Sequence, residues 1–374
     1  MHRFARDDKQ GARDDREKLG MTERILIIRL AAIGDVVMAS TLARRLRDAK
    51  PGAHITWLCG QTAAPLVECF ADVDTVMTID ERRLLAGGTF DRVREVLSLR
   101  SQLRSRDFDT AYLLHPDPRY RILTSSLRGT AVIAQRRDKR RPANPIPGRF
   151  LGDEAARLME GLDEGPIQGH FSLGRLKAFS PAARGDRPRV AIVPGGAKNV
   201  LRESALKRWP VDHYAALARR LFDDGFEVVL VGNAGDDWVR QHFSTVPVTN
   251  LVGRTSIPET LAVFAGSDLV IAHDTGPMHL ARLVGARLIA LFGPTPPSSF
   301  VTPDETTTVL WGGEHLACRP CYDGREFADC ADNECMSSIS VDVVFRTAAT
   351  ILQRETDRTR VPRANQIPDE TAFR

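Results

Sequence analysis

The stretch Asp268–Gly285 crowds polar residues into the junction between two apolar elements. An apolar run ends in His-Asp-Thr-Gly-Pro, and apolar residues at helical spacing follow. Pro277 suits the first turn of a helix, where its missing N–H leaves no hydrogen bond unmade. Free backbone N–H groups and the positive end of a helix dipole attract phosphate. The junction therefore predicts an anion site at Thr275 and Gly276, with His279 in reach; the alternative is an ordinary capped strand–helix turn.

A second stretch, "PGGAKNVLRESALKRWP" (194–210), combines glycines with basic residues. Glycine lets a backbone approach a neighbouring group closely, and lysine can neutralise a diphosphate. Lys207 lies directly before the helix expected from Pro210, which fixes its position. For Lys198 and Arg202, a solvated basic loop is the favoured interpretation.

Two carboxylates also follow predicted strands. Asp35, in "RLAAIGDVVMA", is either a helix N-cap or a general base that faces a cleft. The short AAIG turn lacks the glycine pattern of dinucleotide sites, which disfavours NAD or FAD. Asp236, in "LVGNAGDD", is either a contact to a ribose hydroxyl or a solvated turn acid.

The elements that must position these residues alternate between short apolar runs and longer helical patterns. Strands are expected at 24–30, 53–59, 74–79, 109–115, 129–134, 189–196, 226–235, 268–276 and 287–295, and helices include 35–49 and 210–225. Such alternation predicts an α/β protein with parallel sheets covered on both faces. Ligands of such sheets bind outside the carboxyl ends of the strands, where the polar residues above lie.

A segment rich in Gly, Pro and charge interrupts the alternation and divides the chain into two doubly wound halves. We expect a disordered extension over 1–21, one Rossmann-like domain over 22–170, a linker over 171–188, a second domain over 189–355, and a disordered tail over 356–374.

Composition excludes several classes. A chain of 374 residues with 43% hydrophobic and 27% charged residues is typical of a soluble two-domain protein. A net charge of +4 is too small to indicate a nucleic-acid partner. No apolar stretch approaches the roughly 20 residues of a membrane span, and the polar N-terminus lacks the apolar core of a signal peptide, so we expect a cytoplasmic protein.

Four cysteines are clustered with the spacing C-x2-C-x8-C-x4-C, at Cys318, Cys321, Cys330 and Cys335. In a cytosolic protein such a cluster favours a structural thiolate site for Zn or Fe over disulfides, although the spacing is shorter than in common zinc ribbons. The alternatives are reduced thiols or a pair of disulfides.

Together these stretches resemble glycosyltransferase family 9, the bacterial ADP-heptose:lipopolysaccharide heptosyltransferases. The stretch "SDLVIAHDTGPMHLARLVGARLIALFGPTPP" is similar to the family's Asp-Thr-Gly-x-x-His element and the Phe-Gly-Pro-Thr that follows it. "IRLAAIGDVVMA" resembles its N-terminal Gly-Asp element, and "NLVGRTSIPETLAVFAGSD" resembles the helix before its nucleotide-binding strand. The resemblance covers residues 24–349.

The resemblance implies a GT-B fold, in which two Rossmann-like domains face each other across a cleft. It implies an inverting transfer from ADP-heptose without a catalytic metal, with the acceptor held by the N-terminal domain and the donor by the C-terminal domain. Asp35 would deprotonate the acceptor hydroxyl and Lys207 would meet the donor diphosphate. The donor pocket would contain Asp274, Thr275, Gly276 and His279. Asp236 stands where many members have glutamate near the ribose.

The acceptor side rests on "LLHPDPRYR", which follows a strand of the first domain. Its polar residues are candidates for acceptor contacts: His115, Asp117, Arg119 and Arg121. The basic run 136–141 is either an attractant for a phosphorylated or carboxylated lipid-linked glycan at the inner membrane surface or a solvated loop.

Two alternatives to a lipopolysaccharide heptosyltransferase stay open. One changes the acceptor to a protein or the donor to another nucleotide-sugar. Some related protein heptosyltransferases carry a metal-binding cysteine finger, and the cysteine cluster is therefore a reason to keep a protein acceptor as an alternative. The other alternative is a non-catalytic GT-B protein that binds nucleotides or glycans, against which Asp35, Lys207 and the 274–279 element argue.

Overall fold

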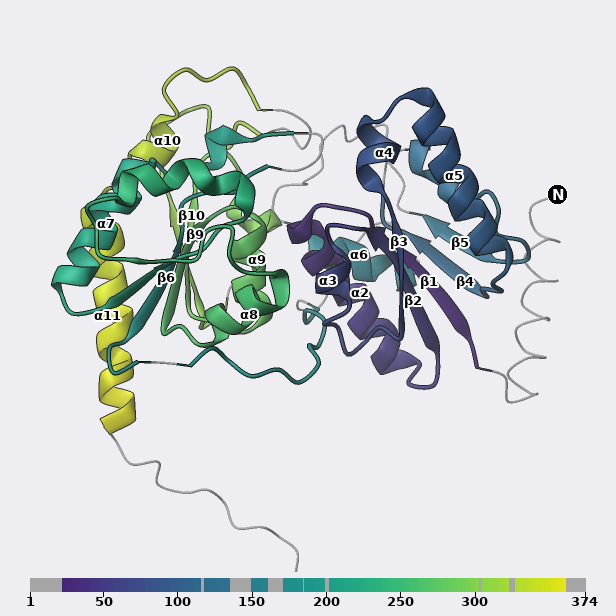
Figure 1. Cartoon of the computed structure of the whole chain (residues 1–374), viewed down its shortest axis with the longest axis horizontal. Helices are drawn as coiled ribbons and strands as arrows, with labels where there is room; N and C mark the ends of the chain where they lie inside the picture. Colours follow the sequence, from purple (N-terminus) through teal and green to yellow (C-terminus); the bar gives the residue numbers. More distant parts are fainter. Residues whose placement is uncertain are drawn as a thin grey trace, which may run out of the picture.

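The chain folds into two α/β lobes that stand side by side, each built on a parallel sheet (Figure 1). The computed structural model describes residues 22–115, 118–134, 149–160, 171–183, 185–198, 202–302, 304–322 and 327–360. The predicted α/β class with two doubly wound domains is confirmed.

The N-terminal sheet has the strand order β3-β2-β1-β4-β5, and all of its pairs are parallel. Its strands are β1 (Arg24–Ile28), β2 (His54–Gly60), β3 (Thr75–Ile79), β4 (Thr110–Leu113) and β5 (Ala131–Ala134). Its helical elements are α2 (Ile33–Ala49), α3 (Ala64–Val67), α4 (Glu81–Ala86), α5 (Thr89–Arg104), the 3-10 helix η1 (Pro118–Thr124) and α6 (Leu151–Glu160).

The C-terminal sheet has the order β11-β10-β9-β6-β7-β8, again with parallel pairs. Its strands are β6 (Arg189–Val193), β7 (Glu227–Leu230), β8 (Thr249–Asn250), β9 (Leu269–His273), β10 (Leu288–Phe292) and β11 (Thr307–Trp311). Its helices are α7 (Val211–Asp223), α8 (Ile257–Ala265), α9 (Gly276–Leu283), α10 (Glu334–Ser337) and α11 (Val341–Arg360), with 3-10 helices η2 (Ala205–Lys207), η3 (Ala234–Phe243) and η4 (Pro297–Ser299).

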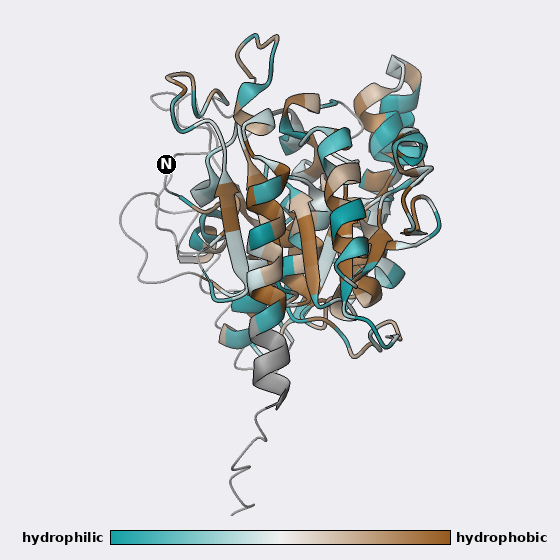
Figure 2. Cartoon of the chain, turned by 90° about the vertical axis from the view of Figure 1, so that its left-hand side faces the viewer, coloured by the Kyte–Doolittle hydropathy of each residue, from teal (hydrophilic) through white to brown (hydrophobic). Residues whose placement is uncertain are grey.

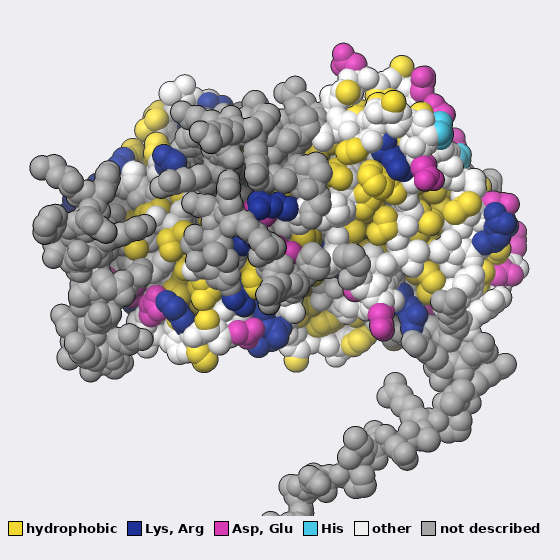
Figure 3. All heavy atoms as spheres, turned by 180° about the vertical axis from the view of Figure 1, so that it is seen from behind, with side chains coloured by type: hydrophobic (Ala, Val, Ile, Leu, Met, Phe, Trp, Pro, Cys, Tyr) yellow, Lys and Arg dark blue, Asp and Glu magenta, His cyan; other side chains and the backbone are white. Residues whose placement is uncertain are grey.

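Burial explains why the central strands read as continuous apolar runs. All five residues of β9 and of β10 are buried, because helices cover both faces of the sheet. Figure 2 shows these apolar strands behind helices that present hydrophilic residues outward. On the face shown in Figure 3, basic and acidic side chains are interspersed, in keeping with the small net charge.

Strand register brings the loops of each sheet to a common edge. Ile28 at the end of β1 pairs with Leu113 at the end of β4, and Val193 at the end of β6 pairs with Ala272 near the end of β9. The segments that follow these strands therefore lie next to each other, as expected for parallel sheets.

The segment 171–183 runs in extended form along both domains. Leu176 forms an antiparallel bridge with Phe70, and the Gly174 N–H donates to Ser40 Oγ at 2.8 Å. Further on, the Ala182 N–H donates to the carbonyl of Ala262 in α8 at 2.9 Å. These bonds tie this part of the predicted linker to each domain.

The C-terminal helix α11 packs on α7 and β9 and ends at Arg360, past the start of the disordered tail predicted from 356. Because Arg and Glu are good helix formers, a helix already nucleated upstream can continue through them. Residues 361–374 and the predicted extension 1–21 lie outside the described residues. Within the described part of the chain, no helix is long and apolar enough to cross a bilayer.

Candidate active site

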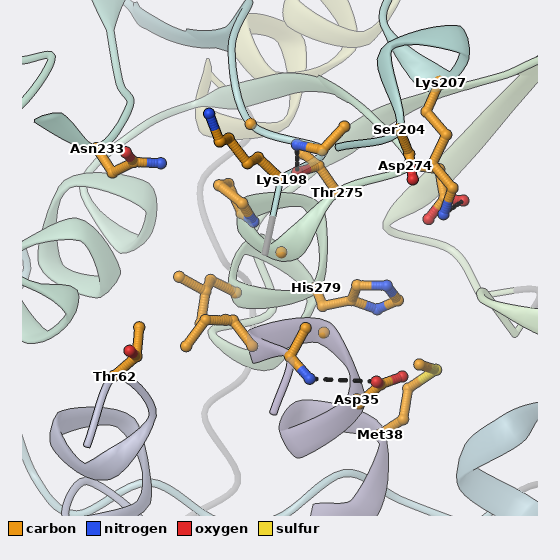
Figure 4. A pocket seen from close by; sticks show the side chains of 18 of the residues that line it. Asp35, Met38, Thr62, Lys198, Ser204, Lys207, Asn233, Asp274, Thr275 and His279 are labelled. Atoms are coloured by element: carbon orange, nitrogen blue, oxygen red, sulfur yellow. Dashed lines mark hydrogen bonds and ion pairs between the residues drawn. The ribbon is translucent and has the colours of Figure 1, made fainter. Parts of the chain in front are cut away.

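A cleft of about 940 Å³ lies between the two domains. Its N-terminal wall comes from the segments after β1 and β4 and from the start of α2, and its C-terminal wall comes from the segments after β6, β7 and β9. Figure 4 shows Asp35 on one wall and Lys207, Asp274 and Thr275 on the other. The loops that follow these strands, which contain the polar residues singled out from the sequence, therefore meet at the cleft.

Asp35 is the third residue of α2 and lines the cleft. The helix begins at Ile33 with Ala32 as its N-cap, so the N-cap interpretation of Asp35 is wrong. Asp35 Oδ2 accepts the Ala32 N–H at 3.2 Å and pairs with Arg29 Nη2 at 2.5 Å, while 34% of the side chain stays exposed. A fixed, partly exposed carboxylate at a cleft wall suits a general base.

Arg29 and His115 hold the loop that carries Asp35. Arg29 Nη1 donates to the carbonyl of Leu114, so one guanidinium bridges Asp35 and the end of β4. His115 lines the cleft, stacks on Tyr120 with ring centroids 3.8 Å apart, and accepts the Leu30 N–H on Nε2 at 3.2 Å. Nothing in the sequence pattern singled out Arg29, since a strand residue gives no sign of which turn it braces.

The two domains touch where α2 and α9 begin. A Cβ on Gly34 would lie 2.6 Å from His279 Cδ2, and a Cβ on Gly276 would lie 3.2 Å from Ile33 Cβ. One buried cluster includes Val36 and Met38 of α2 together with Met278 of α9. The absence of a side chain at Gly34 thus lets His279 reach the N-terminal wall.

His279 lies between Asp35 and the Lys207–Asp274 pair (Figure 4). Burial lowers the pKa of His279 to about 4, although the carboxylates of Asp274 and Asp35 pull the other way, so the ring is neutral at pH 7. Its Nδ1 is buried and has no hydrogen-bond partner among the residues that the structure describes. A buried nitrogen without a protein partner is suited to form a hydrogen bond with a bound ligand.

Lys207 is anchored by an ion pair within the C-terminal wall. Its Nζ lies 2.7 Å from Asp274 Oδ2, and Thr295 Oγ1 donates to the same oxygen at 2.8 Å. Burial opposes ionisation of Asp274, but Lys207, His279 and Thr295 together hold its pKa below the usual value. The pair therefore fixes a cation at the cleft wall, which accounts for Asp274 at the end of β9.

The Gly195–Gly196 turn is held by Asp236 and Thr275. Asp236 Oδ1 accepts the Gly196 N–H at 2.7 Å and Oδ2 accepts the Asn233 N–H at 2.9 Å, and Thr275 Oγ1 accepts the Ala197 N–H at 2.9 Å. Gly196 has φ +86°, and a Cβ there would lie 2.5 Å from Thr275 Oγ1. The predicted close approach is thus to protein side chains.

The surroundings of Asp236 contradict one of its two sequence interpretations. It is buried within η3, so the solvated turn acid is wrong, and its two oxygens are engaged by the amides of separate loops. The expectation of a plain loop failed because a carboxylate at the third position of this 3-10 helix completes a capping box with Asn233.

Phe300 and two aromatic residues of the cysteine-rich segment also line the cleft. Lys207 Nζ lies 5.0 Å from the ring centroid of Phe300 and 5.9 Å from that of Tyr322. The Arg202 guanidinium lies 5.0 Å from the ring of Phe327, at cation–π distance. These contacts were not predicted, because neither Tyr322 nor Phe327 lies in a periodic element.

The remaining acceptor candidates are not brought to the cleft by the described residues. Arg121 is exposed in η1 and is not part of the lining; the backbone of Arg119 lies in η1, and its side chain is outside the described residues. Asp117 and the basic run 136–141 also lie outside them. Instead, Thr62 after β2 and Arg82 at the start of α4 line this wall, and sequence reasoning missed both.

The four clustered cysteines are free thiols. Burial and the three other thiols raise the pKa of Cys335 to about 11, so the four lie near one another. Within the described residues, no three His, Cys, Asp or Glu side chains are placed to hold a metal ion. The Asn333 N–H donates to Cys330 Sγ at 3.3 Å.

We expect Gly34→Ala to lower kcat/KM by about 10- to 100-fold, because the added Cβ would push the two walls apart and a displacement of about 1 Å can cost 10²-fold. Binding of ADP, measured by thermal stabilisation, should weaken as well, because the residue that the added Cβ meets is His279 of the C-terminal wall. Gly52→Ala is the matched control, because nothing lies within 4 Å of that position. Wild-type kinetics for Gly34→Ala would contradict the proposed approach of the walls.

We expect the protein to lose stability as the pH falls below about 6.5. Burial lowers the pKa of His279 to about 4 and that of His273 to about 3, so the unfolded chain binds protons that the native histidines do not. The loss of stability begins near the pKa of a histidine in the unfolded chain and reaches about 2 kcal/mol per histidine at pH 5. It continues as the pH falls toward the pKa values of the two histidines in the folded protein. Chemical denaturation at pH 7 and 5 measures the free energy of unfolding. The His279→Gln variant should lose less of this free energy between the two pH values than the wild type. An equal loss in the variant and the wild type would contradict the role of His279.

Comparison with known proteins agrees with this geometry. A family model described as glycosyltransferase family 9 (heptosyltransferase) matches residues 153–331. Lipopolysaccharide heptosyltransferase 2 of Escherichia coli is 26% identical over 304 residues, 73% of this chain and 84% of that protein. Lipooligosaccharide heptosyltransferase 2 of Haemophilus influenzae is 27% identical and covers 76% of this chain and 88% of its own length.

Solved structures share the fold. The Escherichia coli ADP-heptose lipopolysaccharide heptosyltransferase II matches with a TM-score of 0.67 and 21% identity over 89% of this chain and 99% of that one. TibC of enterotoxigenic Escherichia coli, an iron-containing dodecameric glycosyltransferase, matches with a TM-score of 0.58 and 13% identity over 89% and 77%. The chain thus has two facing domains of the GT-B type, contains a glycosyltransferase family 9 domain, and is a glycosyltransferase.

Proposed function

We propose that the protein is an inverting glycosyltransferase that moves heptose from ADP-heptose to a hydroxyl of a lipopolysaccharide core or a related lipid-linked glycan. The observation that carries this proposal is the pairing of Asp35 on one wall of the cleft with the anchored Lys207 on the other. The curated relatives named above, which match most of this chain, are heptosyltransferases that build such glycans.

In the proposed reaction, Asp35 takes the proton of the acceptor hydroxyl as that oxygen attacks the anomeric carbon. The contacts of Asp35 with Ala32 and Arg29 use Oδ2, which leaves Oδ1 to receive the proton. The bond between the anomeric carbon and the phosphate oxygen breaks, and ADP leaves with the electron pair. Attack on the face opposite the leaving group inverts the configuration.

On the donor wall, Lys207 and the first amides of α9 stabilise charge on the departing diphosphate. The amides of Thr275 and Gly276 lie at the N-terminus of this helix. His279, neutral and with its Nδ1 turned to no protein partner that the structure describes, offers one more hydrogen bond to the donor. These groups supply the positive field without a catalytic metal.

We assign Asp236 a positioning role. Because its oxygens hold the Gly196 and Asn233 amides, it fixes the two loops that border the nucleotide end of the cleft, and the ribose contact is secondary. Val231, Ile257 and Thr260 line the same end of the cleft. The aliphatic side chains of the first two give the adenine base of the donor an apolar wall.

The donor assignment is tested by thermal stabilisation with a panel of nucleotides and nucleotide-sugars, since a ligand that binds the native state raises its melting temperature. ADP and ADP-heptose should raise it, and Lys207→Ala should diminish the rise. Stabilisation by UDP-sugars without a response to ADP or ADP-heptose would overturn the donor assignment.

We propose that the four cysteines form a structural Zn or Fe site. The chemistry of the donor set fits, since one short segment supplies four free thiols and a backbone N–H already donates to Cys330 Sγ. The side chains described here do not converge, so metal binding requires them to turn inward, and no catalytic step depends on it. TibC, which shares the fold, contains iron. The cysteine cluster keeps a protein acceptor as the second candidate function.

We expect about one Zn or Fe per chain in protein purified without chelators. A variant with Cys318 and Cys321 changed to serine should lose the metal, whereas a Cys59→Ser and Cys69→Ser variant, with thiols elsewhere in the fold, should keep it. Metal analysis by plasma mass spectrometry decides, and fewer than about 0.1 equivalents in the wild type would contradict the site.

A further inference from the structure

The outward face of α5 carries a stripe of large apolar side chains. Phe90 is 79% exposed, Val93 is 51% exposed and Leu97 is 57% exposed. Spacings of three and four residues place them on one face of the helix, while Leu99 and Leu103 on the opposite face are buried in the N-terminal core. The stripe therefore points away from the domain that α5 packs against.

Arginines surround this stripe. Arg94 and Arg104 are exposed, and helical geometry places both within the outward face. Glu95 is directed elsewhere, because its carboxylate accepts the Asp80 N–H at 2.9 Å. Arg83 of α4, which packs beside α5, is 53% exposed but pairs with Asp80 Oδ2 at 3.3 Å, so the positive charge of the face comes from Arg94 and Arg104.

A helix that exposes Phe, Val and Leu beside arginines has the chemistry of a segment lying at a membrane surface. Apolar side chains enter the boundary between headgroups and acyl chains, and each nearby arginine gains from anionic headgroups. Isolated exposed apolar residues are ordinary on protein surfaces, but three on one stripe with matched cations are not. We propose that this α5 face (Phe90, Val93, Leu97, Arg94 and Arg104) docks the enzyme on an anionic lipid bilayer.

Charge argues against a second copy of this chain as the occupant. A two-fold contact through this face would bring Arg94 and Arg104 of each copy toward the same residues of the other, with like charges opposed. An anionic bilayer instead supplies the opposite charge along the whole face.

The position of the α5 face relative to the cleft gives the docking a purpose. α4 packs against α5, and Arg82 at the start of α4 lines the acceptor wall of the cleft. Figure 1 shows the α4–α5 pair on the N-terminal lobe, the one that carries this wall. Resting on the proposed function, this places a lipid-linked acceptor at the bilayer beside the wall that must bind it.

Co-sedimentation of the full chain with vesicles tests the proposal. The wild type should bind phosphatidylcholine vesicles that contain phosphatidylglycerol, and should bind pure phosphatidylcholine vesicles at least about tenfold more weakly. Changing Phe90, Val93 and Leu97 together to serine, or Arg94 and Arg104 together to glutamine, should lower the partition coefficient at least about tenfold. Val343→Ser, at a 40% exposed position on α11 in the other domain, is the matched control.

Stabilisation by ADP should be unchanged in these variants, which shows that they fold and keep the donor wall. Undiminished vesicle binding by the triple variant would overturn the proposal. So would a wild-type dimer, seen by sedimentation velocity, that the triple variant dissociates, because the α5 face would then belong to a second copy.

Transfer assays separate this proposal from the proposed function. With a delipidated, soluble acceptor the triple variant should match the wild type, and with the same acceptor embedded in anionic vesicles it should be at least about fivefold slower. Absence of transfer by every variant, with the difference in vesicle binding intact, would refute the heptosyl transfer and leave the docking standing. Equal rates on embedded acceptor would refute the role of the docking in catalysis.

Discussion

Replacing Asp35 with alanine is expected to lower kcat by about 10²–10⁴-fold, the usual contribution of a positioned general base. The carboxylate is partly exposed at the acceptor wall, and its contacts with Ala32 and Arg29 set its orientation. Binding of ADP should remain within about twofold, since Asp35 stands on the opposite wall from the donor loops. Steady-state release of ADP, together with an ADP titration, measures both.

Two variants control for indirect effects. Asp35→Asn keeps the shape and the contact to Ala32 but removes the base, so it should be nearly as slow as alanine. Asp48→Ala changes a carboxylate near the other end of α2, where it pairs with Arg44 and Arg175, and should leave kcat unaltered. Unchanged turnover in Asp35→Ala would mean that another group is the base.

Replacing Lys207 with alanine is expected to lower kcat/KM by about 10²–10³-fold, the size of effect seen when one preorganised stabilising group is removed from an active site. The variant loses the cation at the diphosphate and leaves the buried Asp274 carboxylate without its partner at 2.7 Å. The variant should therefore also be less stable to unfolding, because the Asp274 carboxylate stays buried without a counter-ion to offset its loss of hydration. ADP release and thermal denaturation measure the two effects.

The double variant Lys207→Ala with Asp274→Asn separates these two effects. Removing the orphaned charge should recover much of the stability, while the rate stays low because the cation is still missing. Recovery of the rate in the double variant would show that Lys207 acts only by neutralising Asp274, and its role toward the donor would be refuted.

The sheets were predictable because their strands are buried on both faces and read as uninterrupted apolar runs between helices, as β9 and β10 show. The donor loops were predictable for a related reason: Pro277 and the glycines mark where strands end and helices begin, and parallel sheets bring those points to one edge. Most of the fold could therefore be predicted from local residue types and from the topology of parallel sheets.

The roles within the site were less predictable, because they depend on contacts between distant segments. Asp236, a candidate for a ribose contact, also holds the Gly196 amide, and His115, a candidate for an acceptor contact, also holds the Leu30 amide. Backbone amides give no sequence signal, so such partners cannot be foreseen from residue types. The contact of Gly34 with His279, which closes one domain on the other, is of the same kind.

Direct assay of heptosyl transfer tests the central claim. The protein would be incubated with ADP-heptose and a lipopolysaccharide core acceptor that lacks the transferred heptose, and the product would be analysed by mass spectrometry beside Asp35→Ala. We expect one added heptose per acceptor, equimolar release of ADP, and little product from the variant. ADP-heptose that binds at the cleft but is transferred to no core acceptor, or transfer that proceeds equally in Asp35→Ala, would contradict it.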